Sequence, residues 1–476
     1  MLIKKQFHDI TNTIPLTNLQ SVYACYHLAI SDGAWKCKKL SQRKDHFGDW
    51  CNRLLGQNLC REDPDVKKLY NLLRASNPCS ATKRMHSEII GKDLFKVLRE
   101  KLGGDFGSFI SDKVVAVAGD VSSENLGIKD EKLRKEMLEE IDIVLHSAAS
   151  TKFDERFDVA MGTNTFGAFN VVNFAKSCTK VEILLYVSTA YVCGETDGLV
   201  LEQPFQMGQT LNGFSKLDID FEKKLVEKKL RELRTQNYKE EAVTSIMRNF
   251  GLESTYKEPF PGWVEGVRTI DSFAVAYGKK RITCFPGINK EIVYVMPADM
   301  VVNAIIVAMV ANANQCYDNI YHVGSSIRNP LRYLNLQDYG YKYFTEKPCM
   351  DKDGKLIKVG RITLLDMESF QRYMFIYYFL PLKGLKLINT IFCQRFRKMY
   401  LEYNRKIQIA MRLVDLYSPY LFFCGVFDDI NMEKLRMAAR QGGAEMDSFY
   451  FDPKMIDWED YFINIHVPGI VKYLFK

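Results

Sequence analysis

The sequence predicts an α/β protein built on a doubly wound parallel sheet, with strands missing, followed by a smaller, mostly helical domain. From residue 63 to about 187, short apolar runs alternate with amphipathic segments, which is the pattern of βαβ units. One apolar run, residues 183–187, ends directly in Ser188 and Thr189. Beyond residue 330 the chain is rich in aromatic residues and its pattern is helical.

The first half of the chain contains four apolar runs that are predicted strands. Residues 80–102 and 166–177 are predicted helices between them, and the second carries its apolar side chains along one stripe. The four strands are expected at residues 66–73, 113–118, 141–145 and 181–187.

The remaining elements suggest three parts. Residues 217–248 carry mixed charges, typical of a solvated helical hairpin, and residues 297–313 form an apolar helix with Asp299 as the expected N-cap. The sequence changes character near residue 329. The predicted parts are an atypical, unassigned segment at 1–62, a Rossmann-like domain at 63–328 and a helical domain at 329–476.

The composition is that of a globular protein, with 47% hydrophobic and 26% charged residues. The net charge of +7 is spread over 65 basic and 58 acidic side chains, so it does not indicate a nucleic-acid partner. The twelve cysteines form no CxxC pair and no zinc-type spacing with histidine, and no secretory signal is visible. We therefore expect an intracellular protein with reduced thiols and no metal site.

Two short apolar runs, residues 373–382 and 416–427, bear on membranes. Both fall short of the roughly 20 apolar residues that a membrane-spanning helix needs. We predict that both are core helices. The alternative is a surface that dips into a membrane or holds a lipid chain.

The hydroxyl residues at the end of the run 183–187 are the first candidate for chemistry. In an open α/β sheet, ligands bind at the carboxyl ends of the strands. Ser188 and Thr189 could therefore hydrogen-bond a substrate carbonyl there. The alternative is an ordinary strand stop, because Ser, Thr and Gly are common turn residues.

Several segments together resemble the plant alcohol-forming fatty acyl-CoA reductases, a family of extended short-chain dehydrogenase type. The resemblance runs from about residue 65 to 252 and again from about 258 to 476. The segments that carry it are VKKLYNLLRAS at 66–76, NTFGA at 164–168, VSTAYVCGE at 187–195, EPFPGWVEG at 258–266 and FDDINMEKLR at 427–436.

This resemblance implies an enzyme of lipid and wax metabolism. It would reduce a long-chain acyl-CoA with NADPH, first to the aldehyde and then to the primary alcohol, and release CoA. Residues 63–328 would be the NADP-binding reductase domain and 329–476 the family's C-terminal domain. The substrate suggests a cytoplasmic location or peripheral association with the endoplasmic reticulum membrane, and related reductases are possible partners.

The same resemblance assigns cofactor-binding residues. Arg74 would pair with the 2′-phosphate that distinguishes NADP from NAD, or it is simply a surface arginine. Asp120 and Val121 would contact the adenine, although Asp120 could instead start a turn.

Four further residues follow from the resemblance. Ala148 and Ala149 would let the backbone approach the cofactor, or they allow tight packing between strand and helix. Asn164 would hold the structure around the site. Thr189 would orient the substrate carbonyl, with Ser188 as its neighbour.

The sequence departs from the family at the glycine loop. A dinucleotide fold needs glycines after its first strand, yet neither G-x-x-G-x-x-G nor G-x-G-x-x-G occurs in this chain. Residues 23–30, followed by Ser31, Asp32 and Gly33, are a possible degenerate replacement. Either the N-terminal segment supplies the missing central strand, or the sheet closes up, or the chain folds poorly.

The second departure is the family's Tyr-x-x-x-Lys pair, in which the tyrosine donates a proton. Residues 252–257 join directly the two regions between which the pair is expected. The motif matches only at Tyr343–Lys347 and Tyr450–Lys454, in the C-terminal domain, and we interpret neither as catalytic.

Three hypotheses follow. The chain is an active reductase with another proton donor, or a non-catalytic relative that binds acyl-CoA or partner reductases. The third is that exons are mis-joined before residue 65 and near Glu253.

Overall fold

The structure is a computed structural model. It describes residues 46–47, 67–92, 95–150, 155–193, 196–204, 218–236, 238, 240, 243, 247, 269–280, 282–313, 319–351, 353–441 and 449–474.

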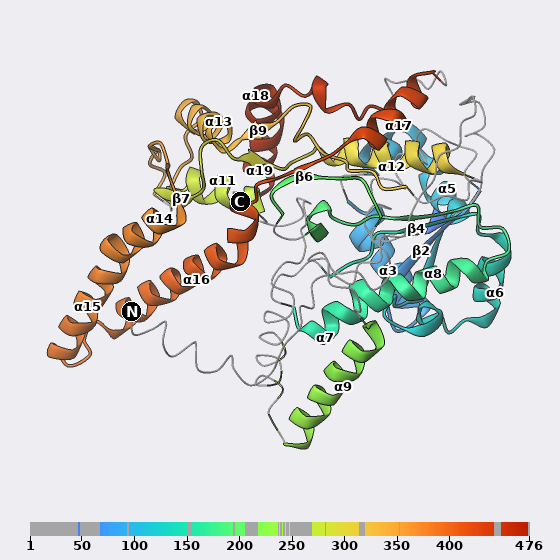
Figure 1. The fold of residues 1–476 in the computed structure, drawn as a ribbon, viewed down its shortest axis with the longest axis horizontal. Helices are drawn as coiled ribbons and strands as arrows, with labels where there is room; N and C mark the ends of the chain where they lie inside the picture. The colour runs from blue at the N-terminus through green and yellow to red at the C-terminus, as the bar shows by residue number, and fades with distance from the viewer. Residues whose placement is uncertain are drawn as a thin grey trace.

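A parallel sheet forms the first half of the molecule (Figure 1). The second strand pairs with the third along its whole length and with the first through His46 and Phe47, and the fourth pairs with the fifth. The first strand also lies against the fourth, so the spatial order is β3, β2, β1, β4, β5, the order of a doubly wound dinucleotide fold. The strands are β1 (His46–Phe47), β2 (Leu69–Arg74), β3 (Val114–Gly119), β4 (Ile143–His146) and β5 (Ile183–Tyr186).

The atypical N-terminal segment supplies the central strand. Of the three outcomes considered for this position, the structure shows the first, because β1 occupies the place between β2 and β4. The strand considered at residues 23–30 lies outside the described residues. A strand of two residues carries no periodicity, which explains why the pattern of the sequence did not locate it.

Helices cover both faces of β2 and β3. Tyr70 and Leu72 pack with one set of helices and Leu73 with the other, because successive side chains of a strand point to opposite faces. One set is α6 (Glu131–Glu140) and α8 (Gly167–Ser177), and the other is α3 (Pro78–Arg84), α4 (Lys96–Leu102) and α5 (Phe106–Lys113).

The single helix predicted at residues 80–102 is interrupted. Asn77 caps α3 by accepting a hydrogen bond from the Ser80 amide at 2.9 Å. The helix then passes into a π-helical turn, Met85–Ile90, and ends at Gly91. A Cβ at Gly91 would lie 2.6 Å from the His86 carbonyl oxygen, so only glycine fits this ending. The next helix, α4, begins five residues later.

The C-terminal part of the chain returns to cover β4 and β5. Their side chains Leu145 and Leu185 join one core cluster with α12 (Ala298–Asn312) and α17 (Ile430–Gln441). The start of α12 differs from the prediction. Pro297 is its N-cap and makes no side-chain hydrogen bond, while Asp299 lies in the first turn, where its charge complements the helix dipole.

Three strand pairs connect segments far apart in the sequence. Four helices in the described part of the chain after residue 268 share one core cluster: α11 (Thr269–Gly278), α13 (Tyr333–Glu346), α18 (Trp458–Asp460) and α19 (Val467–Leu474). All three pairs join a strand before residue 329 to a strand after it, and the division at residue 329 remains a prediction. The pairs are β6 (Gly198–Val200) with β11 (Gly425–Phe427), β7 (Cys284–Pro286) with β10 (Thr363–Leu365), and β8 (Ile292–Val293) with β9 (Leu331–Arg332).

The charged segment after residue 217 begins with a regular helix, α9 (Ile219–Thr235). Asp218 caps it by accepting from the amides of Asp220 and Phe221. Its apolar side packs on α7 (Phe157–Ala160) and the π-helical turn that follows. The second helix of the predicted hairpin lies largely outside the described residues.

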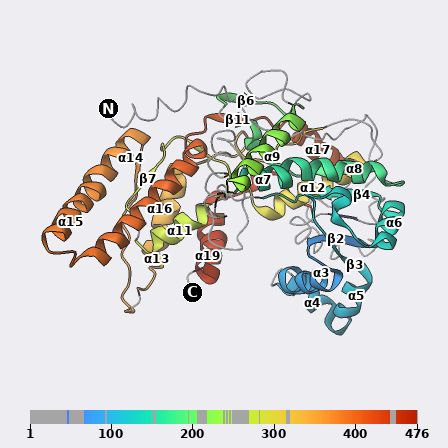
Figure 2. The same ribbon diagram turned by 90° about the horizontal axis from the view of Figure 1, so that it is seen from below.

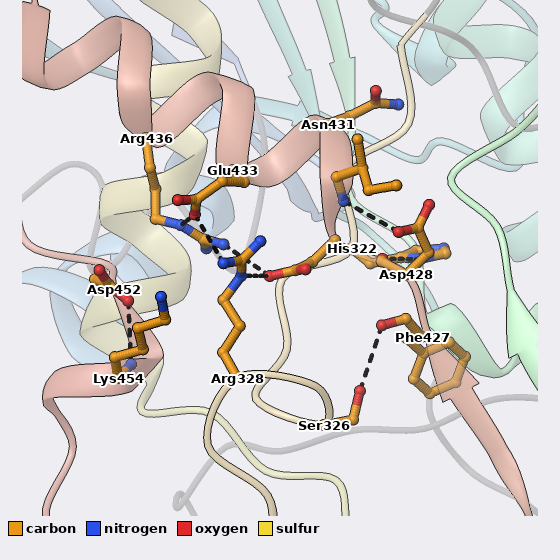
Figure 3. A network of polar contacts seen from close by, with 12 residues as sticks. His322, Ser326, Arg328, Phe427, Asp428, Asn431, Glu433, Arg436, Asp452 and Lys454 are labelled. Atoms are coloured by element: carbon orange, nitrogen blue, oxygen red, sulfur yellow. Dashed lines mark hydrogen bonds and ion pairs between the residues drawn. The ribbon is translucent and has the colours of Figure 1, made fainter.

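A buried polar network fixes the last third of the chain (Figure 3). Arg436, on α17, is 1% exposed and bonds Asp429 and Glu433, both at 2.7 Å. Arg328 reaches the same two carboxylates. Nearby, Glu202 accepts hydrogen bonds from the His322 amide and from the first turn of α17, and burial raises its pKa to about 7.

A long helical hairpin projects from the rest of the molecule (Figures 1 and 2). It consists of α14 (Met367–Met374), which continues through a π-helical turn into α15 (Leu380–Ile391), and of α16 (Arg397–Leu421). Residues 373–382 were predicted to be a core helix. They are helical, but the core prediction is wrong for Phe375, Ile376, Tyr377 and Leu380, which are at least half exposed. The second run, residues 416–427, has buried side chains as predicted, but its helix ends at Leu421 and its last three residues form a strand, Gly425–Phe427. Among the described helices, none has both the length and the apolar character to cross a bilayer.

The end of β3 gives a stability prediction. A Cβ at Gly119 would lie 2.3 Å from the Leu126 carbonyl oxygen and 2.7 Å from Leu72 Cδ1. We expect Gly119→Ala to lower the free energy of unfolding by about 1–3 kcal/mol in urea denaturation. Gly107→Ala, on α5, is the matched control, because a Cβ there meets nothing within 4 Å. Equal stability of the two variants would contradict the close packing at Gly119.

Candidate functional site

The candidate residues lie at the carboxyl edge of the parallel sheet, where ligands of such folds bind. Arg74 is the last residue of β2, and Asp120 and Val121 directly follow β3. Ala148 and Ala149 follow β4, and Ser188 and Thr189 follow β5. The topology therefore brings all strand-end candidates to one edge, as the sequence predicted.

Arg74 and Asp120 form an ion pair on neighbouring strand ends. Arg74 Nε lies 2.8 Å from Asp120 Oδ2, and the arginine side chain is 62% exposed. Within the described part of the chain, the two terminal nitrogens of Arg74 have no partner. The guanidinium is thus held in place while two of its nitrogens stay available for an anion.

Asp120 also organises a tight turn. Its Oδ1 accepts from the Ser122 amide at 2.9 Å and from the Ser122 hydroxyl at 2.8 Å, and its own amide donates to the Leu126 carbonyl at 2.7 Å. The alternative that Asp120 starts a turn is therefore confirmed, and it is compatible with a ligand contact. Val121 is buried, and its carbonyl accepts from Asn170 Nδ2 at 2.9 Å, which ties this turn to α8.

Asn164 holds the loop that follows β4. It is 4% exposed, and its side chain makes two bonds to one residue: Oδ1 accepts from the Ser150 amide at 2.7 Å, and Nδ2 donates to the Ser150 carbonyl at 3.1 Å. The two alanines just before Ser150 differ. Ala148 packs against the core beneath the sheet, whereas Ala149 is exposed, as close approach to a ligand requires.

Ser188 and Thr189 lie just beyond the last backbone hydrogen bond between β4 and β5. In that bond the Val187 amide donates to the His146 carbonyl at 2.8 Å. Ser188 is exposed and Thr189 is half-buried. Thr189 Oγ1 accepts from the Tyr191 amide at 3.3 Å, so it also starts the short helical turn that follows. Because the oxygen acts as the acceptor, the hydroxyl proton remains able to donate to a substrate carbonyl.

The imidazole of His146 was not singled out from the sequence. It is the last residue of β4, is 4% exposed and stacks on Tyr186 with 5.1 Å between ring centres. Among the described residues, its Nε2 has no hydrogen-bond partner, and burial lowers its pKa to about 4. The ring is therefore neutral at physiological pH. The only sequence signal was a titratable residue ending a buried run.

The described tyrosines offer no obvious proton donor at this edge. Tyr343 lies on α13 in the core cluster around Trp458, and Lys347 Nζ is 5.3 Å from the centre of its ring. This pair belongs to the packing of that cluster and not to the edge of the sheet. Tyr191 follows Thr189 closely, but burial raises its pKa well above the ordinary value and four aromatic rings surround it. Within the described ranges, no group of three His, Cys, Asp or Glu could hold a metal ion.

Comparisons with family models match both halves of the chain. The NAD-binding model described as "Male sterility protein" matches residues 53–305, and the model named Sterile, with the same description, matches residues 377–476. The first matched region is thus a domain for a nicotinamide cofactor.

Curated proteins of similar sequence cover nearly the whole chain. The chain is 45% identical to "Alcohol-forming fatty acyl-CoA reductase" of Simmondsia chinensis, over 89% of this chain and 94% of that protein. It is 43% identical to "Fatty acyl-CoA reductase 1" of Arabidopsis thaliana, over 89% and 95%.

One solved structure supports the fold. The terminal R domain from the myxalamid PKS-NRPS biosynthetic pathway matches with a TM-score of 0.50 at 16% identity, over 96% of each chain. At this identity the likeness concerns the fold alone, and it confirms the predicted Rossmann-like class.

The buried imidazole predicts a pH dependence of stability. The unfolded chain takes up a proton on His146 near pH 6.5, whereas the folded chain does so only near pH 4. Stability from this group is therefore complete above pH 6.5 and is lost as the pH falls towards 4, by about 3 kcal/mol. We expect His146→Phe to lose correspondingly less stability than the wild type between pH 7 and 4.5 in urea denaturation. Parallel pH profiles would show that the ring is not held neutral.

Proposed function

The chain belongs to the plant alcohol-forming fatty acyl-CoA reductases, and we propose that it reduces a long-chain fatty acyl-CoA to the primary alcohol with NADPH. The observation that carries this proposal is the 45% identity, across both matched regions, to a protein named for that activity. The carboxyl edge of the sheet supports it, because the side chains expected around cofactor and substrate all lie along this edge.

The reaction consumes two NADPH and two protons per acyl-CoA. When bound, NADPH would supply one hydride to the thioester carbonyl, so that the C–S bond breaks and CoA leaves as the protonated thiol, and a second hydride and a proton would convert the aldehyde to the alcohol. Negative charge develops on the carbonyl oxygen in both steps, so a hydrogen bond there stabilises the transition state. We assign this bond to the Thr189 hydroxyl, with Ser188 as its exposed neighbour.

The residues present fit the adenosine end of NADPH. Arg74 presents an exposed guanidinium, fixed by Asp120 through Nε, at the end of the second strand. Such a group can bind the 2′-phosphate through its terminal nitrogens. Asn164 keeps the loop with Ala148 and Ala149 in one conformation at the end of β4. Gly48 directly follows β1, but the family's full glycine loop is absent from the sequence.

A non-catalytic relative is the second candidate. The sequence lacks the expected Tyr-x-x-x-Lys pair near the sheet, and the described edge offers no obvious replacement. Such a protein would bind acyl-CoA, or associate with related reductases, without turnover.

The third candidate is a sequence with mis-joined exons. The match to the Simmondsia protein spans 465 aligned positions, yet 89% of the 476 residues is only about 424 residues. About 40 aligned positions of that protein therefore have no residue opposite them here, the difference between 465 and 424. The absence of these aligned positions is consistent with a missing segment at the abrupt join, residues 252–257. Transcript sequencing across this join, and before Asp65, decides the matter: an intervening segment with Tyr-x-x-x-Lys supports mis-joining, and a continuous transcript refutes it.

We further propose an intracellular site of action, in the cytoplasm or at the surface of the endoplasmic reticulum. The seven cysteines that the structure describes form no disulfide bond with one another.

The first test is turnover by the purified chain with NADPH and saturated long-chain acyl-CoA. Without a positioned proton donor, we expect alcohol formation about 10²–10⁴-fold slower than that of the Simmondsia relative. Thr189→Val should lower the residual rate further, while Thr345→Val, the same change at an exposed position on α13, is the control and should leave the rate unchanged. Saturable acyl-CoA binding without any product would instead establish the non-catalytic candidate.

The second test concerns the choice of cofactor. Arg74→Ala should weaken NADPH binding at least about tenfold, because a charge-assisted contact is lost, and leave NADH binding nearly unchanged. Arg361→Ala is the matched control, since Arg361 is 59% exposed and ion-paired to Asp338. Equal weakening of both nucleotides, measured by fluorescence titration, would remove Arg74 from the 2′-phosphate site.

A further inference from the structure

The outer side of the projecting hairpin carries a row of exposed apolar residues, called here the apolar stripe, with Lys383 and Gly384 on the turn between Leu380 and Leu387. Ile376, Leu380, Leu387 and Ile391 follow one another at helical spacing along α15 and the turn before it. All four are more than half exposed, with Leu387 at 63% and Ile391 at 66%. Phe392 continues the stripe beyond the end of α15 at 56% exposure.

The opposite side of the same helix already has its own packing partners. Leu382 on α15 and Met374 on α14 share a core cluster with Ile407 on α16. The outer stripe is therefore additional apolar surface, which the hairpin does not need for its own packing. Apolar residues in a row on a projecting element indicate a surface that meets something else.

Basic residues lie to one side of this stripe and near the turn that follows it. From residue 369 to 401 the chain has no Asp or Glu. On a helical wheel, Lys383 and Lys386 lie to one side of the stripe, both exposed. The basic residues of this segment are Arg372, Lys383, Lys386, Arg395, Arg397 and Lys398.

The tip of the hairpin is held in a fixed conformation. Cys393 and Gln394 both have positive φ, of 49° and 66°. Asn389, which is 4% exposed, stabilises this turn by bonding the Gln394 side chain at 2.8 Å and the Phe396 amide at 2.9 Å. The apolar and basic side chains on both sides of the turn are thus presented together.

We propose that this hairpin docks on the surface of a bilayer that contains anionic phospholipids. The apolar stripe enters the boundary between headgroups and acyl chains, and the flanking lysines and arginines bind the headgroup phosphates. A second copy of the chain is a poorer occupant, because a two-fold dimer places the same basic surface against itself. The docking is independent of the reductase reaction and is tested without acyl-CoA or nucleotide.

The test is co-sedimentation of the full chain with vesicles of phosphatidylcholine alone or with about one quarter phosphatidylserine. Leu387→Ser/Ile391→Ser removes apolar contact, and Lys383→Glu/Lys386→Glu reverses charge. Ile465→Ser/Met455→Ser is the matched apolar control, at 59% and 68% exposure elsewhere. Lys132→Glu/Lys135→Glu, exposed on α6, is the matched charge control.

We expect the wild type and both controls to bind the anionic vesicles well and the neutral vesicles poorly. Each hairpin variant should lose at least about tenfold in partitioning, while its circular dichroism and thermal unfolding match the wild type. Unchanged binding by both hairpin variants would overturn the proposal. So would the absence of vesicle binding, or wild-type dimers in lipid-free sedimentation that Leu387→Ser/Ile391→Ser dissociates.

Discussion

A buried arginine determines how the C-terminal part of the chain closes on the sheet. Arg436 is almost wholly buried and is compensated by Asp429 and Glu433, which Arg328 also contacts. Removing one partner from such a cluster leaves an uncompensated buried charge, which costs about 3–5 kcal/mol. Because α17 carries Arg436 and packs with α12 over β4 and β5, this cluster fixes the cover of that half of the sheet.

A second buried polar group, Glu202, also contacts the start of α17. Glu202 is buried, yet it receives hydrogen bonds from the His322 amide and from the start of α17. Its carboxylate thus caps the Asn431 amide, while Asp428, from the chain just before the helix, accepts from the Ile430 amide at 3.2 Å. A residue more than 200 positions away in the chain performs this task, so the end of the first half and the beginning of α17 are placed relative to each other.

Much of the sheet could be predicted from the sequence, because β2 to β5 are continuous apolar runs separated by helices. Their carboxyl ends then had to meet at one edge, which located Arg74, Asp120, Ala149 and Thr189 before any contact was known. Other features left no local signal. The strand at His46–Phe47 is too short for a period, and β6 meets β11 only because of tertiary packing. The exposed state of residues 373–382 could not be read from composition, since core and surface helices share it. His146 and the Arg74–Asp120 bond depended on side-chain geometry.

The brevity of the central strand has a consequence for the whole domain. Through the described residues, the backbone ladder joins β1 to β2 and β4 to β5, while the packing of α6 and α8 beneath the sheet connects the two sides. The carboxyl edge crosses this seam, with Arg74 and Asp120 on one side and Ala149 and Thr189 on the other. A ligand bound along the edge would contact both sides and hold them together. Ligand binding would then make the unfolding of the domain more cooperative, and the ligand-free domain would separate first between β1 and β4.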